Sequence, residues 1–467
     1  MKLKKLLYLF CALLFSFLSL NAQQKREARM WLTTPDRTAL VTPQAVTLYF
    51  SREAGRLPVL AVDDAQHFQS IDGFGFALTG GSAQLLMRMS PSQRAALLRE
   101  LFTTGDNGIG VSYLRVSIGS SDMNERVYSY DDLPPGETDV EMAKFNLGPD
   151  RADVIPVLKE ILAIRPEIKI LGSPWSAPAW MKTNNDVKAG ELKPEYYGAF
   201  AKYFVKYIEE MRAEGIAMDA ITVENEPLNP KNTPSMVVFA KEEDAFIEND
   251  LGPAFSKAGI RTKILLYDHN PDVLSYPLSI LGDPAANKYV DGTAFHLYGG
   301  DASLLTQVHD AYPQKNLYLT EQSVTEPRSG PLGIAEAVRR VIIGATRNWC
   351  RNVLLWNLAA DPQNGPHTNN GGCTDCSGAV TLNDGSVTKN VAYYAVEHFS
   401  QFVPPASLRV ASSELEQLAS VAFLTPQHKM VLVVSNTANF AKPFAVKYHD
   451  TFFQTTLPPE SVGTYVW

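Results

Sequence analysis

A strand, a helix and a second strand follow one another between residues 169 and 223, and this stretch decides the fold. Lys169–Ser173 (KILGS) is a short apolar run typical of a buried strand, and Ala220–Val223 (AITV) is another. Between them, Pro194–Met211 (PEYYGAFAKYFVKYIEEM) carries apolar residues at helical spacing. A strand, a helix and a strand in this order are the repeating unit of a parallel sheet.

The same alternation continues in both directions along the chain. Eight strand–helix pairs between residues 68 and 402 predict an α/β fold, a (β/α)8 TIM barrel. The predicted strands are 69–79, 110–118, 169–173, 220–223, 263–267, 293–297, 317–320 and 353–358. The predicted helices begin at Ser90 and near Asp150, and then cover 194–211, 241–257, 276–290, 302–311, 333–349 and 391–402.

The two ends of the chain differ from the barrel. Residues 23–67 and 403–467 contain short alternating strands, such as 45–50 and 431–434, and no predicted helix. The simplest arrangement joins the two segments in one β-sandwich that packs beside the barrel as a side domain.

Residues 1–22 predict a cleaved export signal. Lys2, Lys4 and Lys5 precede an apolar run over Leu6–Leu20, and Ala22 is small enough for a cleavage site. A membrane-spanning helix needs about 20 apolar residues, so the run is too short, and no later stretch is long enough. We therefore expect an exported protein without a membrane span, located in the periplasm, at the cell surface or outside the cell.

The charge of the chain argues against nucleic acid as a partner. The 467 residues carry a formal net charge of −8, which becomes −11 once the three lysines of the export signal are removed. An acidic surface without a basic patch repels polyanions. We expect a monomer that acts on a neutral ligand.

Three cysteines follow the export signal: Cys350, Cys373 and Cys376. The last two have the spacing of half a zinc site, but no second pair of cysteines or histidines completes it. In an exported protein a short-loop disulfide between Cys373 and Cys376 is favoured over two free thiols. We expect neither a metal ion nor a cofactor.

Polar and aromatic residues gather at the ends of the predicted strands, where barrel enzymes carry their catalytic groups. Aromatic faces stack on sugar C–H groups, while carboxylates and amides bind hydroxyls, so this set predicts a sugar site. Its members are Thr79, Gly80, Arg115, Asp122, Trp175, Trp180, Glu224, Asn225, Glu226, Asp268, His269, Asn270, His296, Tyr298, Glu321, Gln322, Trp356 and Asn357.

Two glutamates suit glycoside hydrolysis. Glu226 follows the fourth strand and Glu321 ends the seventh. A separation of about 5–5.5 Å between their carboxyl groups would permit double displacement with retention of configuration. Glu321 would then attack the anomeric carbon, and Glu226, its pKa raised by neighbouring negative charge, would act as acid and base. Asn225 would bind the sugar 2-hydroxyl.

The residues leave other interpretations open. A single glutamate at a strand end more often forms a salt bridge or a cap, and spacing alone does not choose between Glu224 and Glu226. Trp175, Trp180 and Trp356, taken singly, more often belong to a core than to a stacking platform, although the proline-flanked loop around Trp175 and Trp180 favours exposure of these two. His296 equally suits a buried histidine, and Arg115 more readily orients a glutamate than touches substrate.

Five motifs, in order, resemble glycoside hydrolase family 30, the glucosylceramidase-like group. They are Ile71–Gly75 (IDGFG), Ser173–Pro178 (SPWSAP), Glu224–Pro227 (ENEP), His296–Tyr298 (HLY) and Leu319–Glu321 (LTE). The resemblance covers residue 68 to the C-terminus and implies the same barrel and side domain. It implies Glu226 as the acid/base and Glu321 as the nucleophile. Together with Asp122 from the strand ends, the expected substrate-binding residues are Arg115, Trp175, Asn225, His296, Tyr298 and Trp356.

One departure from the family pattern bears on the substrate. Glucosylceramidases usually carry a Thr-Asp pair where this chain has Thr79 and Gly80. Loss of the acid would remove a clamp on a terminal sugar and leave room for a further one. The loop from Gly371 to Gly378 also looks like bacterial β-1,6-glucanases of the family. We therefore expect an endo-β-1,6-glucanase that cleaves a β-glucan polysaccharide or oligosaccharide by double displacement.

Two rival functions remain at this stage. The first is an exo-acting β-glucosidase or glucosylceramidase with the same catalytic residues. The second is a catalytically silent sugar-binding protein, against which the presence of both glutamates argues. A serine or zinc hydrolase is disfavoured because the chain contains no Gly-x-Ser-x-Gly and no His-Glu-x-x-His motif.

Overall fold

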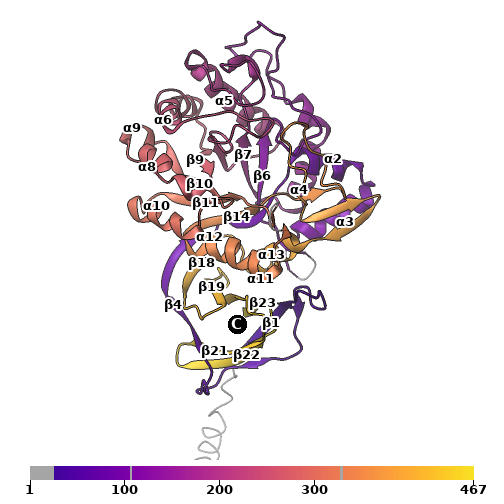
Figure 1. The fold of residues 1–467 in the computed structure, drawn as a ribbon, viewed down its shortest axis with the longest axis vertical. Helices are drawn as coiled ribbons and strands as arrows, with labels where there is room; N and C mark the ends of the chain where they lie inside the picture. The colour runs from indigo at the N-terminus through magenta and orange to yellow at the C-terminus, as the bar shows by residue number, and fades with distance from the viewer. Residues whose placement is uncertain (1–25, 106–107, 327–329) are drawn as a thin grey trace, which may run out of the picture.

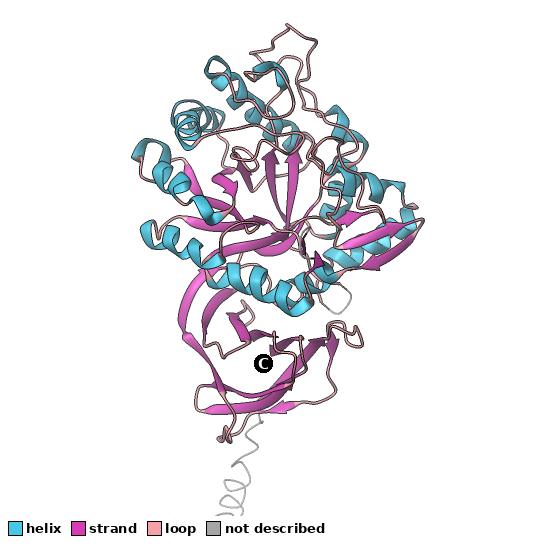
Figure 2. Ribbon diagram, viewed as in Figure 1, coloured by secondary structure: helices cyan, strands magenta, loops and turns pink. Residues whose placement is uncertain are grey.

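The computed structural model describes residues 26–105, 108–326 and 330–467, so the predicted export signal lies outside the described residues. The chain forms a barrel surrounded by helices and a separate β-domain below it (Figure 1). Helices α11, α12 and α13 lie between the two parts. Figure 2 shows that the β-domain contains strands and loops, whereas all long helices surround the barrel.

Eight parallel strands close the barrel, as the alternation predicts. Each pairs in parallel with its neighbours, in the order β5-β6-β7-β8-β9-β10-β11-β14 and back to β5. The strands are β5 (Gly73–Ala77), β6 (Tyr113–Ile118), β7 (Lys169–Pro174), β8 (Ala220–Thr222), β9 (Lys263–His269), β10 (Val290–His296), β11 (Asn316–Glu321) and β14 (Cys350–Leu355).

The helices follow their strands around the outside of the barrel. Some are divided by short π-helical segments, η4 (Ile247–Leu251) and η7 (Val338–Ile343). The α-helices are α2 (Gly80–Arg88), α3 (Pro91–Phe102), α4 (Val154–Ile164), α5 (Tyr197–Ala213), α6 (Ala240–Phe246), α7 (Gly252–Ala258), α8 (Ser275–Leu281), α9 (Pro284–Asn287), α10 (Leu305–Ala311), α11 (Ile334–Ala337), α12 (Gly344–Arg347) and α13 (Val391–Ser400).

Local sequence signals explain where several helices lie. The Ser90 hydroxyl accepts a hydrogen bond from the backbone N–H of Gln93, and Pro91 occupies the first turn, so α3 begins where predicted. In α5 the apolar residues at helical spacing are buried against the barrel. Helix α2 was not predicted, because its start, Gly80-Gly81-Ser82, has low helix propensity.

A layer of side chains fills the interior of the barrel. It combines two tyrosines with smaller apolar residues, one from each of seven strands, and each is completely buried. Barrels of this class are packed inside in the same way, so the barrel is a core and not a channel. The members are Tyr113, Leu171, Ala220, Leu265, Ala294, Tyr318 and Leu354.

The first predicted strand, 69–79, is in fact two. Strand β4 (Val59–Ser70) belongs to the side domain, where it pairs with β18 and β21, and β5 starts the barrel at Gly73. The sequence pattern joined them because both are strands, and only Ile71 and Asp72 separate them. Strand β4 therefore runs through the predicted domain boundary after residue 67.

The N- and C-terminal segments share one mainly antiparallel sheet of ten strands, which confirms the predicted side β-domain. Its order is β2-β1-β23-β20-β19-β18-β4-β21-β22, with β3 paired to β1. The bounds are β1 (Glu27–Thr33), β2 (Thr42–Pro43), β3 (Leu48–Tyr49), β18 (Leu408–Ser412), β19 (Leu418–Leu424), β20 (Met430–Asn436), β21 (Lys442–Tyr448), β22 (Thr451–Leu457) and β23 (Val462–Val466). Short strands elsewhere are β12 (Thr325–Glu326), β13 (Gly330–Pro331), β15 (Ala359–Ala360), β16 (Val380–Asn383) and β17 (Ser386–Lys389).

A buried histidine connects the barrel to the side domain. His398 of α13 lies 2.8 Å from the Thr464 hydroxyl through Nδ1 and 2.8 Å from the Thr33 hydroxyl through Nε2. The two threonines belong to β23 and β1, so one imidazole joins a barrel helix to both ends of the chain. Among the described residues, no helix is long and apolar enough to cross a membrane.

Candidate active site

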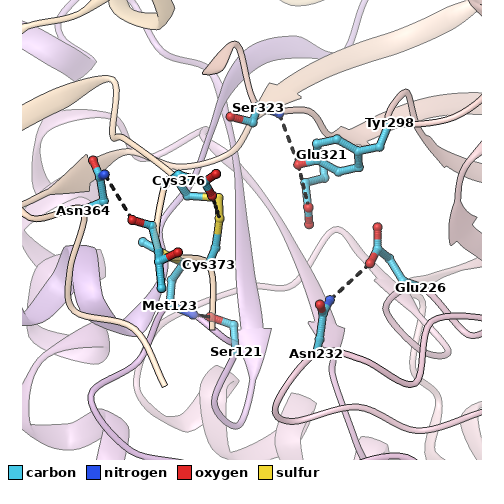
Figure 3. The surroundings of a disulfide bond; sticks show 12 residues. Ser121, Met123, Glu226, Asn232, Tyr298, Glu321, Ser323, Asn364, Cys373 and Cys376 are labelled. Carbon is cyan, nitrogen blue, oxygen red and sulfur yellow. Dashed lines mark hydrogen bonds between the residues drawn. A yellow bond between two sulfur atoms is a disulfide. The ribbon is translucent and has the colours of Figure 1, made fainter. Parts of the chain in front are cut away.

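The two predicted catalytic glutamates point toward each other at the C-terminal end of the barrel (Figure 3). Glu321 is the last residue of β11, and Glu226 lies in the loop after β8. Both are almost completely buried, with 4% and 7% of their surfaces exposed. The structure therefore brings together two carboxyl groups that are 95 positions apart in the sequence.

The backbone of Glu226 decides which glutamate of the Glu-Asn-Glu motif enters the site. Its φ is +47°, in the left-handed region, and its N–H donates to the carbonyl oxygen of Asp268 at 3.0 Å. This turn directs Glu226 toward Glu321. Glu224 is instead buried elsewhere; burial raises its pKa well above the usual range, against the opposing charge of Lys182.

Two histidines and two asparagines surround Glu226. Its Oε1 lies 3.1 Å from Nδ1 of His296 and 3.8 Å from Nδ1 of His269. Its Oε2 accepts hydrogen bonds from Asn229 at 2.7 Å and Asn232 at 3.2 Å. These contacts leave Glu226 with a fixed orientation.

The expected rise in the pKa of Glu226 is wrong. Burial alone raises this pKa, but the hydrogen bond and charge of His296, the charge of His269 and the hydrogen bond from Asn229 outweigh it and lower it to about 2. The sequence suggested nearby carboxylates but not that two imidazoles would lie closer. Glu226 therefore rests in the ionised form, the form that a general base requires.

Glu321 has a different set of partners. Arg115 donates from Nη1 to its Oε2 at 2.7 Å, and the Tyr298 hydroxyl donates to its Oε1 at 2.9 Å. The Tyr298 hydroxyl in turn accepts from the backbone N–H of Ser323 at 3.1 Å. Burial raises the pKa of Glu321, and this effect prevails over the positive charges of His296 and Arg115.

Asp268, one of the residues at the predicted strand ends, is the buried anion that organises the site. It is completely buried. Its Oδ1 lies 3.2 Å from Nε2 of His296, and its Oδ2 accepts a hydrogen bond from Nη2 of Arg115 at 2.8 Å. Burial opposes its ionisation, but the charge of Arg115 and the contact with His296 hold its pKa well below the usual range. Three hydroxyl groups also donate to it, those of Ser173, Thr222 and Thr320.

His296 lies between three carboxylates. Besides Glu226 and Asp268, its Nε2 is 4.0 Å from Oε2 of Glu321. Burial lowers its pKa, but the charge of Glu321 and the contacts with Asp268 and Glu226 raise it to about 10. The ring therefore carries a proton that faces Glu226 across 3.1 Å, so the pair holds a proton although Glu226 itself is ionised.

Asp122 is buried, and its chain neighbours Ser121 and Met123 lie beside the disulfide of Cys373 and Cys376 (Figure 3). The disulfide joins Cys373 to Cys376, as predicted. The backbone N–H of Cys373 bonds to the Asp122 carboxyl, and the N–H of Thr368 donates to the Asp122 carbonyl oxygen at 2.8 Å. Burial and the charges of Glu321 and Glu226 raise the pKa of Asp122 well above its usual range.

The tryptophans differ in their positions. Trp175 and Trp356 pack against each other with ring centroids 5.5 Å apart, and they also contact Cys376 and Met123. With 2% and 3% of their surfaces exposed, they form a wall of the site and not free platforms. Trp180 belongs to the main core and donates to Asp131, away from the glutamates.

The remaining predicted binding residues lie at the glutamates. The Asn225 Oδ1 accepts from Nη2 of Arg115 at 2.6 Å. Tyr298 is 42% exposed, so its ring is accessible while its hydroxyl contacts Glu321. Asn229 and Asn232 were missed, although their positions three and six residues after Glu226 keep them within reach of it in the same loop.

The space expected at Gly80 is not open. A Cβ atom on Gly80 would lie 1.9 Å from Nδ2 of Asn124. The expectation that Gly80 leaves room for a further sugar is therefore wrong, since the Asn124 carboxamide fills that space. The Thr79 side chain is also turned away from the site, because its hydroxyl accepts a hydrogen bond from the backbone N–H of Ser82 and so caps α2.

In the part of the chain that the structure describes, two groups of side chains have the composition of a metal site. The donor atoms of Glu226, His269 and His296 all lie within 4.8 Å of one another. Cys373, Asp375 and Cys376 form the second group, but the disulfide removes both sulfurs as ligands.

Comparison with known proteins gives consistent matches. A model described as the glycosyl hydrolase family 30 TIM-barrel domain matches residues 71–403, and one for the beta sandwich domain of that family matches residues 407–465. An endo-1,6-β-D-glucanase of Aspergillus fumigatus is 37% identical over 405 residues, 81% of each chain. The lysosomal acid glucosylceramidase of Mus musculus is 32% identical over 435 residues, 88% of this chain and 83% of the mouse protein. The solved structure of an endo-β1,6-glucanase is 34% identical, with a TM-score of 0.87 over 94% of this chain and 99% of that chain.

Proposed function

Because the chain belongs to glycosyl hydrolase family 30 and is a glycosidase, we propose that it cleaves β-1,6-glucan within the chain, with retention of configuration. The observation that carries the proposal is the pair of buried glutamates that face each other around His296. The relatives support the substrate, since the endo-1,6-β-glucanases among them are 36–38% identical to this chain.

In the first step, an oxygen of Glu321 attacks the anomeric carbon and forms a glycosyl ester. The bond from that carbon to the glycosidic oxygen breaks, and this oxygen takes a proton that passes from Nδ1 of His296 through Oε1 of Glu226, which leaves His296 neutral. The hydrogen bonds from Arg115 and Tyr298 hold the carboxyl group of Glu321 in one orientation during the attack.

In the second step, Glu226 removes a proton from water, and the water oxygen displaces Glu321 from the anomeric carbon. Esterification has removed the charge of Glu321 by then, so the repulsion between the two glutamates is gone. Two displacements on one carbon restore the original configuration. Asn225, next to Glu226 and bonded to Arg115, is suited to bind the sugar 2-hydroxyl.

The experiment is product analysis on β-1,6-glucan, with the variants Glu321→Gln and Glu226→Gln. We expect oligosaccharides of mixed length from the parent protein and none from Glu321→Gln. Glu224→Gln is the matched control: it makes the same change two residues from Glu226, outside the site, and keeps the activity. Proton NMR of the first product tests the mechanism, since the α-anomer appearing first would exclude retention.

An exo-acting glucosidase or glucosylceramidase is the second candidate, because the mouse glucosylceramidase is 32% identical over most of both chains. Asn124 occupies the position that the side chain of an acid after Thr79 would need. The structure therefore gives no support for a terminal-sugar clamp there. Glucose as the sole product from β-1,6-glucan would favour this second candidate.

We also propose that the protein is exported. The Cys373–Cys376 disulfide supports this, because disulfides persist in oxidising compartments. N-terminal sequencing of the protein from a cell that secretes it tests the proposal. A mature terminus at residue 23 supports cleavage after Ala22, whereas a protein that retains Met1 contradicts it.

A further inference from the structure

We propose that Glu226, His269 and His296 form a binding site for a divalent zinc-like ion, and that the ion inhibits the enzyme by occupying the acid/base. Binding of the ion does not depend on the proposed function, whereas inhibition rests on it. Two imidazoles and one carboxylate are a common ligand set for Zn²⁺.

The distances between the donor atoms suit such an ion. Oε1 of Glu226 is 3.1 Å from Nδ1 of His296 and 3.8 Å from Nδ1 of His269. Ligands bound tetrahedrally to zinc at about 2.0–2.2 Å lie roughly 3.3–3.5 Å from one another. The two separations bracket this value, and all three donors lie within 4.8 Å, so shifts of about an ångström complete the geometry.

Two of the three ligands are already held by groups behind them. Nε2 of His296 lies 3.2 Å from Oδ1 of Asp268, which directs the other ring nitrogen at Glu226. A carboxylate behind a histidine is the usual outer contact of a zinc ligand, where it fixes the ring and increases its basicity. Asn229 and Asn232 bind Oε2 of Glu226 and leave Oε1 to face the histidines.

His269 is the residue that the hydrolysis mechanism leaves unused. Within residues 26–105, 108–326 and 330–467, its buried Nδ1 has no hydrogen-bond partner. Tyr267 and Asp268, just before it, both have φ in the left-handed region, +72° and +50°, and this distortion at the end of β9 accompanies the placement of His269 next to Glu226. A buried ring nitrogen without a partner next to a carboxylate is an available metal ligand.

The charge around the site also favours a dication. Three carboxylates, those of Glu226, Glu321 and Asp268, surround the histidines, and Arg115 is the cation that pairs with two of them. With neutral imidazoles this group carries two excess negative charges, which one divalent ion balances. Mg²⁺ and Ca²⁺ prefer oxygen ligands and fit this nitrogen-rich set poorly.

An ion at this position stops the reaction for a defined reason. The lone pair of Glu226 Oε1 that must carry the proton is then bound to the metal, and the proton of His296 is displaced from the nitrogen that faces it. The leaving group consequently receives no proton, and water is not deprotonated.

Calorimetric titration with zinc chloride tests the site without reference to activity. We expect one ion per chain for the parent protein, and affinity weakened by more than about tenfold in His269→Gln, because one of three ligands is gone. His449→Gln is the matched control, since His449 is an exposed histidine that contacts Asp64 in the side domain. It should bind zinc as the parent protein does, and magnesium or calcium chloride should give no binding.

Activity and crystallography separate the possible outcomes. Zinc should inhibit glucan hydrolysis, and EDTA should restore the activity. The zinc concentration that gives half inhibition should rise in His269→Gln by the same factor as the dissociation constant measured by calorimetry. Anomalous scattering from crystals soaked in zinc chloride should lie among the three side chains, a readout that needs no variant to fold.

Equal zinc affinity of parent and His269→Gln, or an anomalous peak only at His449 and Asp64, overturns the proposal. Zinc binding through His269 in a protein without glucanase activity leaves the site standing and overturns the proposed function.

Discussion

Arg115 joins the candidate nucleophile to the buried anion of the site. Its Nη1 donates to Glu321 at 2.7 Å and its Nη2 donates to Asp268 at 2.8 Å. Two nitrogens of one planar group thus hold two carboxylates that come from different strands, β11 and β9. The position of Glu321 relative to the rest of the site therefore depends on a fork that only arginine provides.

Replacement of Arg115 by lysine should keep the charge and lose one of the two contacts. We expect kcat/KM for β-1,6-glucan to fall about 100-fold, because the lysine ammonium does not reach both carboxylates with the same geometry. Arg94→Lys is the control, since Arg94 makes a similar paired contact with Glu160 between α3 and α4, away from the site. Equal activity of Arg115→Lys and the parent protein would show that the fork is dispensable.

The disulfide should support binding of glucan more than the chemical steps. Cys376 packs with Trp175 and Trp356, and Cys373 bonds to Asp122 through its backbone N–H. In the double variant Cys373→Ser/Cys376→Ser we expect KM for β-1,6-glucan to rise severalfold, with a smaller change for a small aryl β-glucoside.

Treatment of the parent protein with dithiothreitol should reproduce that shift in KM. Cys350→Ala controls for thiol effects, since Cys350 is a buried free cysteine at the start of β14. A double variant with the KM of the parent protein for glucan contradicts the prediction.

Gly80 should resist substitution because of Asn124. A Cβ atom at Gly80 collides with the Asn124 carboxamide, so Gly80→Ala should lower the melting temperature by about 2–6 °C through overpacking. The same substitution in an Asn124→Gly background should cost much less, because the carboxamide is absent. Thermal unfolding of the parent protein, the two single variants and the double variant measures this coupling. If the changes in melting temperature of the two single variants add up in the double variant, the steric explanation is refuted.

His398 should make the protein sensitive to acid. Burial lowers its pKa to about 3, whereas in the unfolded chain a histidine takes up its proton near pH 6.5. Between these values the unfolded state binds a proton that the folded state does not, so stability is lost as the pH falls, at about 1.4 kcal/mol per pH unit below 6.5.

His398→Gln should therefore lose less stability between pH 6.5 and 4.5 than the parent protein, although it is less stable at pH 7. Thermal unfolding at both pH values measures the difference. Replacement of the exposed His428 by glutamine is the control and should leave the slope unchanged. The same pH slope in His398→Gln as in the parent would exclude His398 as the source.

The sequence by itself determined the features that depend on near neighbours in the chain. Strand and helix alternation predicted the barrel, because each strand needs helical cover on its outer face and each crossover is local. The helix signal at Ser90 and Pro91 and the short loop between Cys373 and Cys376 are also local, and both appear in the structure. The family resemblance supplied the roles of Glu226 and Glu321.

Only the tertiary structure decided the features that depend on distant residues. The pKa of Glu226 is set by His296 and His269, which come from other strands, and their interactions with Glu226 reversed the expected direction. The space at Gly80 is filled by Asn124 from the loop after β6. Asp268 has no sequence motif of its own, and it is important because five side chains from β6, β7, β8, β10 and β11 converge on it. Electrostatic and steric effects act through space, so residues that lie far apart in the sequence determine them once the barrel has closed.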